Sequence, residues 1–257
     1  MTSSNRPTLK ISNHSGTTFQ MPQNTPTKSV ADFNFTESTV DLQDLTRAWD
    51  AALEEALLTL THDNKVNTFL IAGVKVGLRY KKISANAVAL MSGYSKSTFF
   101  RLFPNVDNFT EKGFFLVNSL IIQIYEKHVY SRERTLEGHV DLILTLCVGA
   151  YAVYPADILK RMSEKHNGDI FKIHPHTPRL AEAIIKGLHH QAATRDLAIE
   201  HQSLIDLLFM LDDNLMRTAL QCDGTLLKPT YFDFLYKVLH GFLAQCHTND
   251  AQVFHTG

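Results

Sequence analysis

Apolar residues recur every three or four positions along most of this chain, and no segment of useful length alternates apolar and polar residues as a strand does. The first such run extends from Leu42 to Leu60 and carries Trp49 and Leu53 on one face. Similar runs follow at 66–80, 85–92, 96–103, 114–130, 135–154, 155–166, 178–193, 199–220 and 230–246. This spacing is typical of helices that bury one face. The expected fold class is therefore all-α.

Cap-forming residues divide the segment from 84 to 105 into two short helices. Ser84 is placed to cap the first, and Gly93 to end it in the left-handed conformation. Ser95 is placed to cap the second, KSTFFRLF, which Pro104 ends. With the helix over 66–80 these two form a three-helix unit, with a tight turn before the last helix. A helix-turn-helix of this kind is a known DNA-docking unit.

The last helix of this unit is predicted to be apolar on one side and polar on the other. Phe99 and Phe103 are four residues apart and can bury against the two preceding helices. The other side carries cations and hydroxyls near a helix N-terminus, a combination that suits phosphates and base edges: Lys96, Ser97, Thr98 and Arg101. A solvated polar face on a core-packed helix would give the same pattern.

Charge is distributed unevenly along the chain. The formal net charge is only −1, but residues 64–112 carry eight cations and two anions, a balance of +6, and the remainder carries −7. A compact basic segment in an acidic chain favours a local surface for nucleic acid. A mildly basic solvated surface is the alternative interpretation.

The stretch from Ile83 to Phe115, ISANAVALMSGYSKSTFFRLFPNVDNFTEKGFF, resembles the DNA-binding region of TetR-type (tetracycline-repressor-like) transcriptional regulators. In that family's pattern Ser84 takes an opening Thr, and Ser92-Gly93-Tyr94-Ser95 stand for Ala-Gly-Val-Ser. Phe103 is the closing aromatic. The resemblance implies a homodimeric, sequence-specific DNA-binding regulator, expected to be a repressor controlled by a small-molecule effector. It places the contacts to double-stranded DNA at Ser84, Asn86, Ser95, Lys96, Ser97, Thr98, Phe100, Arg101 and Lys112.

Two positions depart from the family pattern. Phe100 stands where the family often has a phosphate-binding Tyr, and Val106 stands where a Lys commonly opens the next helix. Both changes weaken the expected anchoring to the DNA backbone. They leave open a second interpretation, a protein of the same fold that has lost DNA binding and acts as a partner-binding or ligand-sequestering dimer.

The expected domain organisation follows from composition and from the resemblance. Residues 1–37 are rich in Ser, Thr, Asn and Pro and predict a flexible tail. Residues 38–62 form an extra helix, 63–110 the helix-turn-helix DNA-binding domain, and 111–250 a helical domain for ligand binding and dimerisation. The expected effector pocket comprises Leu144, Cys147, Tyr151, Phe171, Ile184 and Leu188. The apolar stripes expected to form the dimer interface, or to fill one monomer's core, comprise Leu204, Leu208, Leu211, Phe232, Leu235, Leu239 and Phe242.

Other kinds of chemistry find little support in the sequence. Three cysteines, Cys147, Cys222 and Cys246, lie far apart in apolar segments, which indicates reduced thiols. His174, His176, His189 and His190 lack the spacing of a metal site, so no metal and no cofactor are expected. No GxSxG, HExxH or phosphate-loop pattern occurs, so an enzyme is not expected. No apolar run of membrane-spanning length occurs, so a cytoplasmic, nucleoid-associated protein without membrane contact is expected.

Overall fold

The computed structural model describes residues 28–34, 42–62, 64–80, 82–154, 156–221 and 229–246. Helices are the regular elements of these residues, and no strand occurs among them, which confirms the all-α class. Their order and bounds are α1 (Leu42–Leu58), α2 (Lys65–Tyr80), α3 (Ala85–Ser92), α4 (Lys96–Leu102), α5 (Val106–Val129), α6 (Leu136–Val153), α7 (Ala156–Lys165), α8 (Ile170–Ile173), α9 (Thr177–His190), α10 (His201–Gln221) and α11 (Pro229–Gln245).

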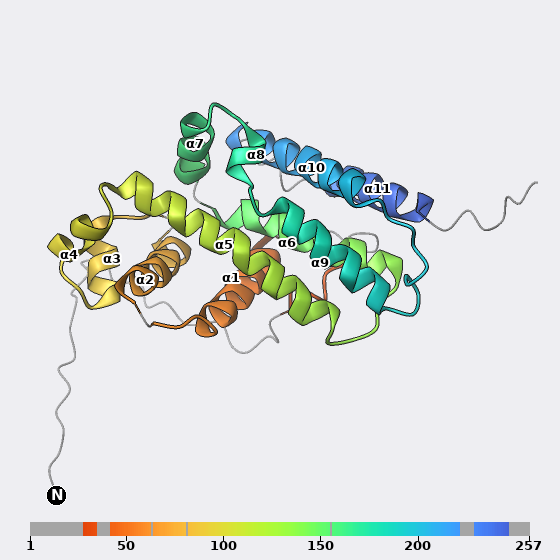
Figure 1. Cartoon of the computed structure of the whole chain (residues 1–257), viewed down its shortest axis with the longest axis horizontal. Helices are drawn as coiled ribbons and strands as arrows, with labels where there is room; N and C mark the ends of the chain where they lie inside the picture. The colour runs from red at the N-terminus through yellow and green to blue at the C-terminus, as the bar shows by residue number, and fades with distance from the viewer. Residues whose placement is uncertain are drawn as a thin grey trace, which may run out of the picture.

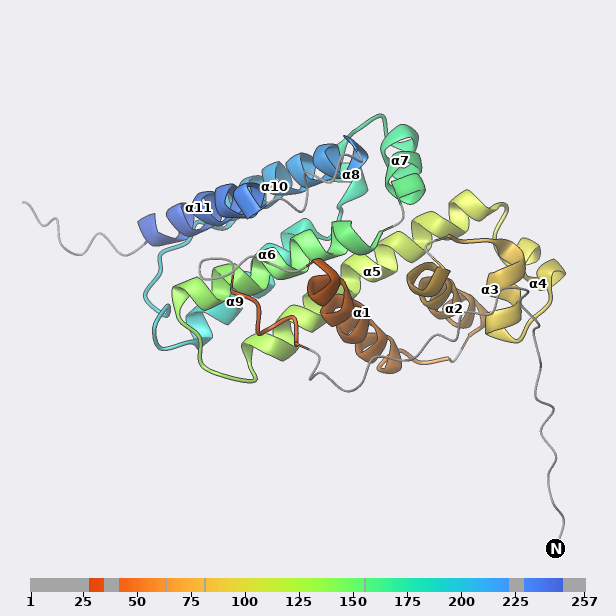
Figure 2. The same cartoon turned by 180° about the vertical axis from the view of Figure 1, so that it is seen from behind.

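The helices form an elongated molecule with a small head at one end. Figure 1 shows α2, α3 and α4 gathered at that end, which we call the head, while α5 runs from the head into the remaining helices, the body. From behind, Figure 2 shows α1 lying beside α5 and α6, with α10 and α11 along the far edge of the body. None of the described helices has the length and apolarity needed to traverse a bilayer.

Two hydrophobic cores correspond to the head and the body. The head core is built on Phe69, Phe99, Phe103 and Phe109, each fully buried, whose rings pack edge-on or tilted with centroids between 4.9 and 6.1 Å apart. The larger body core runs through α1, α5, α6, α9, α10 and α11. Aromatic pairs in this geometry contribute beyond the area that they bury.

The predicted domain boundary between residues 110 and 111 falls inside a continuous helix. Phe109, in the first turn of α5, belongs to the head core, whereas Phe114 and Val117 further along belong to the body core. A Cβ on Gly73 of α2 would lie 2.2 Å from the Phe109 ring, so the close approach of α2 to α5 requires glycine there. The head is therefore joined to the body through one continuous helix, and Ile71 and Val74 of α2 also pack in the body core.

The extra helix α1 is a packed part of the body. Trp49 is fully buried, and its indole Nε1 donates to the backbone oxygens of Thr145 and Leu146 at 3.2 and 3.1 Å. A Cβ on Gly149 of α6 would lie only 1.7 Å from the indole ring. This helix therefore packs closely on α6, which accepts it through a glycine.

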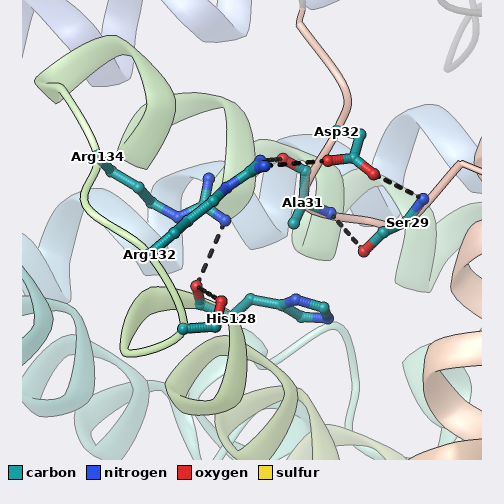
Figure 3. A network of polar contacts seen from close by, with 7 residues as sticks. Ser29, Ala31, Asp32, His128, Arg132 and Arg134 are labelled. Atoms are coloured by element: carbon teal, nitrogen blue, oxygen red, sulfur yellow. Dashed lines mark hydrogen bonds and ion pairs between the residues drawn. The ribbon is translucent and has the colours of Figure 1, made fainter.

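Residues 28–34 also differ from the expected flexible tail, because this short segment is anchored on the body. Val30 and Phe33 are buried in the body core. Figure 3 shows Asp32 and the carbonyl oxygen of Ala31 facing Arg132 in the loop between α5 and α6; the Arg132–Asp32 ion pair measures 3.2 Å. The expectation rested on average composition, which hides two apolar anchors. The rest of the predicted tail lies outside the described residues.

The stretch between the predicted helical runs at 155–166 and 178–193 contains the one-turn helix α8. Asp169 caps it by accepting hydrogen bonds from the amides of Phe171 and Lys172 at 3.1 and 3.4 Å. An aspartate cap offsets the orphan amide groups of a first turn. Gly168, Pro175 and Pro178 usually interrupt helices, so the sequence did not indicate a capped helix here.

Candidate functional site

The turn between α3 and α4 is formed by the capping residues that the sequence predicted. Ser84 accepts from the amide of Ala87 at 3.3 Å, and Ser95 accepts from that of Thr98 at 3.2 Å. Gly93 has φ +74°, and the amides of Gly93 and Tyr94 donate to Leu90 and Ala89 at 3.3 and 3.2 Å. This pair of bonds closes a helix end through a left-handed residue and fixes the angle at which α4 leaves the turn.

The inner face of α4 is held firmly against the head core. Phe99 and Phe103 are both fully buried, and they contact the rings of Phe69 and Phe109. α4 has only seven residues and would not persist alone in water. Its position therefore depends on these aromatic contacts, which keep its other face turned outward.

The predicted DNA contacts lie mostly on the exposed surface of the head. Lys96, Ser97 and Arg101 are exposed on α4, while Thr98 is half-buried. Ser95 is exposed, but its hydroxyl is engaged with those of Ser97 and Thr98 at 2.8 and 3.0 Å. The remaining candidates are also exposed: Ser84 and Asn86 at the start of α3, Phe100 on α4, and Lys112 on α5.

The two anions of the basic segment are held by cations of α7. Arg161 binds Asp107, and Lys165 binds Glu111, which also lies 3.1 Å from the Nε2 of His166. The described cations of the segment have no carboxylate within ion-pair distance in the part of the chain that the structure covers: Lys65, Lys75, Arg79, Lys82, Lys96, Arg101 and Lys112. Asp50 and Glu54 of α1 line one hollow together with Lys75 and Arg79. Among the described residues the cations of α4 thus have no close ion pair.

Aromatic rings accompany several of these cations. The ammonium of Lys96 lies 5.8 Å from the ring centroid of Phe100, and that of Lys65 lies 5.6 Å from the ring of Tyr94. Phe100 is 43% exposed, so it offers an apolar edge where the family pattern has a hydroxyl. Val106 opens α5 half-buried, next to the cap Asn105, and adds no charge at that helix start. Leu90 of α3, also in the head, is 85% exposed.

The residues predicted for an effector pocket are placed mainly inside the body core. Leu144, Cys147, Tyr151, Ile184 and Leu188 are all buried there. Phe171, in contrast, is 63% exposed on α8, with its ring 4.5 Å from that of Phe209. Burial raises the pKa of the Cys147 thiol, which is typical of an unreactive core cysteine.

Two small cavities lie away from these residues. One, of about 40 Å³, is almost entirely apolar and lies at the junction of head and body, where α2 meets α5; Gly73, Gly77 and Gly113 are in its walls. The other, of about 30 Å³, is polar and is lined by residues of α5, α9 and α10 together with His174. Of the residues predicted for the effector pocket, Tyr151 contacts a residue that lines this polar cavity. Its hydroxyl lies 2.8 Å from Nε2 of His174.

The residues around the polar cavity were not predicted from the sequence. Asn118 of α5 and Asp212 of α10 line it together with His174 and Thr177. Thr177 donates to the Asp212 carboxylate at 3.2 Å, and the Tyr154 hydroxyl donates to the Asn118 side chain at 2.9 Å. The available signal was a polar residue in an otherwise apolar helical stripe, at Asn118 after Val117 and at Asp212 after Leu211.

The stripes expected to form a dimer interface are largely buried within one chain. Leu204, Leu208 and Leu211 of α10 face α6 and α9, while the α11 stripe packs on α6. The buried members on α11 are Phe232, Leu235 and Leu239, and Phe242 is half-buried. The monomer-core interpretation accounts for these side chains. The exposed large apolar residues of the same helices are Met210 and Phe234, which are 53% and 52% exposed.

His174 and His176 line the same cavity, but the described residues contain no group of three or more His, Cys, Asp and Glu suited to a metal ion. His189 lies 2.9 Å from the carbonyl oxygen of Leu197, while the His190 ring packs against Tyr130. No protein-family model matches the chain, and no curated protein matches it either.

Proposed function

We propose that this chain is a DNA-binding transcriptional regulator, a repressor that acts as a homodimer and responds to a small molecule. One observation carries the proposal: a short helix, fixed by caps and a phenylalanine core, presents Lys96, Ser97 and Arg101 outward, and among the described residues neither cation has a carboxylate within ion-pair distance. A capped, cationic helix of this size suits the major groove of a duplex. The resemblance of residues 83–115 to TetR-type regulators supports the same proposal.

Dimerisation is part of this proposal, because one short helix reads few base pairs and two-fold paired half-sites supply the rest. The buried stripes of α10 and α11 are occupied inside the monomer, so the contact would use the outer faces of these helices. Met210 and Phe234 are the large exposed apolar side chains available there.

The test is a mobility-shift titration of genomic DNA fragments at two salt concentrations, with Lys96→Ala and Arg101→Ala compared with the unmodified chain. Each variant is expected to weaken binding by about 1–3 kcal/mol if its side chain contacts a base edge. Lys237→Ala on α11 is the matched control, because Lys237 is equally exposed but lies in the body, paired with Asp233 at 2.6 Å. Binding that is neither saturable nor salt-sensitive at low salt would overturn the proposal.

A second function, a partner-binding dimer without DNA binding, is favoured by one observation. The head exposes apolar side chains beside its cations, Leu90 at 85%, Phe100 at 43% and Met91 at 41%. Apolar surface of this kind is more typical of protein contacts than of phosphate contacts. A stoichiometric protein partner recovered with the unmodified chain and lost in Leu90→Glu, with no DNA retention, would select this alternative.

A further inference from the structure

The polar cavity in the body has room for only part of a ligand. Its volume is about 30 Å³, whereas one enclosed water needs roughly 10–15 Å³ measured in this way. Two or three water-sized groups therefore fit inside. An occupant of the cavity would insert one small polar end and keep the rest of the molecule outside.

Asn118 brings an unused hydrogen-bond donor to this cavity. The residue is only 7% exposed, and its side-chain oxygen accepts from the Tyr154 hydroxyl at 2.9 Å. Its Nδ2 is buried and has no hydrogen-bond partner. A buried amide nitrogen left unpaired is unfavourable, and an acceptor atom of a ligand would satisfy it.

Asp212 brings a negative charge that lacks a full cationic partner. Its side chain is 14% exposed, and the basic group within ion-pair distance of it among the described residues is His174, with Nδ1 4.0 Å from the carboxylate. His176 lines the same cavity, and the Tyr151 hydroxyl also lies close to Asp212. Burial raises the pKa of Asp212, an effect that His174, Thr177 and Tyr151 partly offset. Burial likewise lowers the pKa of His174, so the imidazole is a weak cation here.

Burial lowers the pKa of His174, which favours a neutral imidazole. The Tyr151 hydroxyl has a single proton, and three acceptors lie within its reach: Nε2 of His174 at 2.8 Å, the backbone carbonyl of Asp212 at 3.1 Å and the Asp212 carboxylate at 3.5 Å. Thr177 also donates to the carboxylate, at 3.2 Å. Asp212 is therefore contacted by hydroxyl groups and by a weakly basic imidazole, and not by a full positive charge.

We propose that this cavity binds the end of a small molecule that carries an ammonium group close to a carbonyl-type oxygen. The ammonium pairs with the Asp212 carboxylate, and the oxygen accepts from Nδ2 of Asn118. This inference rests on the proposed function, since it names the chemical class of the effector. It also places the ligand on α5, the helix whose first turn closes the head core.

The experiment follows the side-chain amide of Asn118 by nitrogen–proton NMR on the full-length labelled chain, with the signal assigned by its loss in Asn118→Leu. The probes are glycinamide and β-alaninamide, each with an ammonium and a carbonyl, and their matched controls propionamide, which lacks the charge, and propylammonium, which lacks the acceptor. At least one ammonium amide is expected to shift the signal saturably, with half-saturation about tenfold lower than either control, a difference of about 1.4 kcal/mol.

Asp212→Asn is expected to remove the preference for the ammonium amide over propionamide. Asp213→Asn is the matched control, because the neighbouring carboxylate points outward and pairs with Arg217 at 2.8 Å; it should leave the preference intact. No saturable shift with either ammonium amide, equal binding of propionamide, or a preference that survives Asp212→Asn would each overturn the inference. If Asp212→Asn does not fold, the half-saturation values of the ammonium amides and their two controls on the unmodified chain still test the inference.

These measurements contain no DNA, so the two proposals fail separately. A specific Asn118 shift in a chain that gives no mobility shift would retain the ligand site and remove the regulator. A chain that binds DNA but shows no selective shift would retain the regulator and remove this ligand class.

Discussion

The docking of α1 on α6 makes a quantitative prediction about Gly149. A Cβ at this position would lie 1.7 Å from the Trp49 ring, whereas carbon atoms in contact lie about 3.5–4.0 Å apart. The ring would have to move by roughly 2 Å and would lose both hydrogen bonds to α6. Gly149→Ala should therefore cost nearly as much as removing the indole itself, about 3–5 kcal/mol for Trp49→Ala.

The same geometry predicts strong coupling between the two positions. Once Trp49→Ala has removed the ring, a Cβ at 149 meets no indole, and alanine is the better helix former by up to about 1 kcal/mol. The double variant should match Trp49→Ala or exceed it slightly in stability, which gives a coupling of about 3 kcal/mol between the two sites.

Urea unfolding followed by far-UV circular dichroism measures this double-mutant cycle. Gly113→Ala is the matched control, because it also replaces a glycine inside a long helix, but its Cβ would meet no atom within 4 Å. That variant should be neutral or stabilising. A Gly149→Ala chain as stable as Gly113→Ala, or one whose loss persists without the indole, would refute the reasoning.

Three further predictions concern the head and one buried titrating group. Ser95→Ala removes the cap of α4 and should cost about 0.5–2 kcal/mol in thermal unfolding, whereas Ser97→Ala, which removes no cap, should change little. Gly93→Ala places a side chain at φ +74° and should cost about 1 kcal/mol, measured in the same way. Burial and the charge of Arg134 lower the pKa of His139 to about 4, against about 6.5 in the unfolded chain. The neutral imidazole therefore contributes stability that is fully present above about pH 6.5 and is lost as the pH falls to about 4. The loss amounts to about 3 kcal/mol in the free energy of unfolding. His139→Asn should flatten that part of the stability–pH curve, and an unchanged slope would contradict the assignment.

The local structure of the head could be predicted from the sequence, because its signals are local. Ser84, Gly93 and Ser95 each act within four residues along the chain, and the structure confirms their caps. The aromatic face of α4 likewise follows from the four-residue spacing of Phe99 and Phe103. Their role toward DNA stays a prediction.

The polar cavity could not be predicted in the same way, because it depends on contacts between distant segments. Asn118, His174 and Asp212 come together only when α5, α9 and α10 pack against one another. His174 follows the short helix α8 directly, so the position of its side chain depends on that turn. That turn leaves Phe171 on the surface, although its apolar character had suggested a pocket. Periodicity indicates which face of a helix is buried, but not which buried residues enclose space.

The chain contains one tryptophan, and it lies on α1. Tryptophan emission from this protein therefore originates beside the backbone of α6, in the body and outside the head core. A change in that emission on adding a compound would report a change in the packing of α1 on α6. Events confined to α4 would leave the emission unchanged.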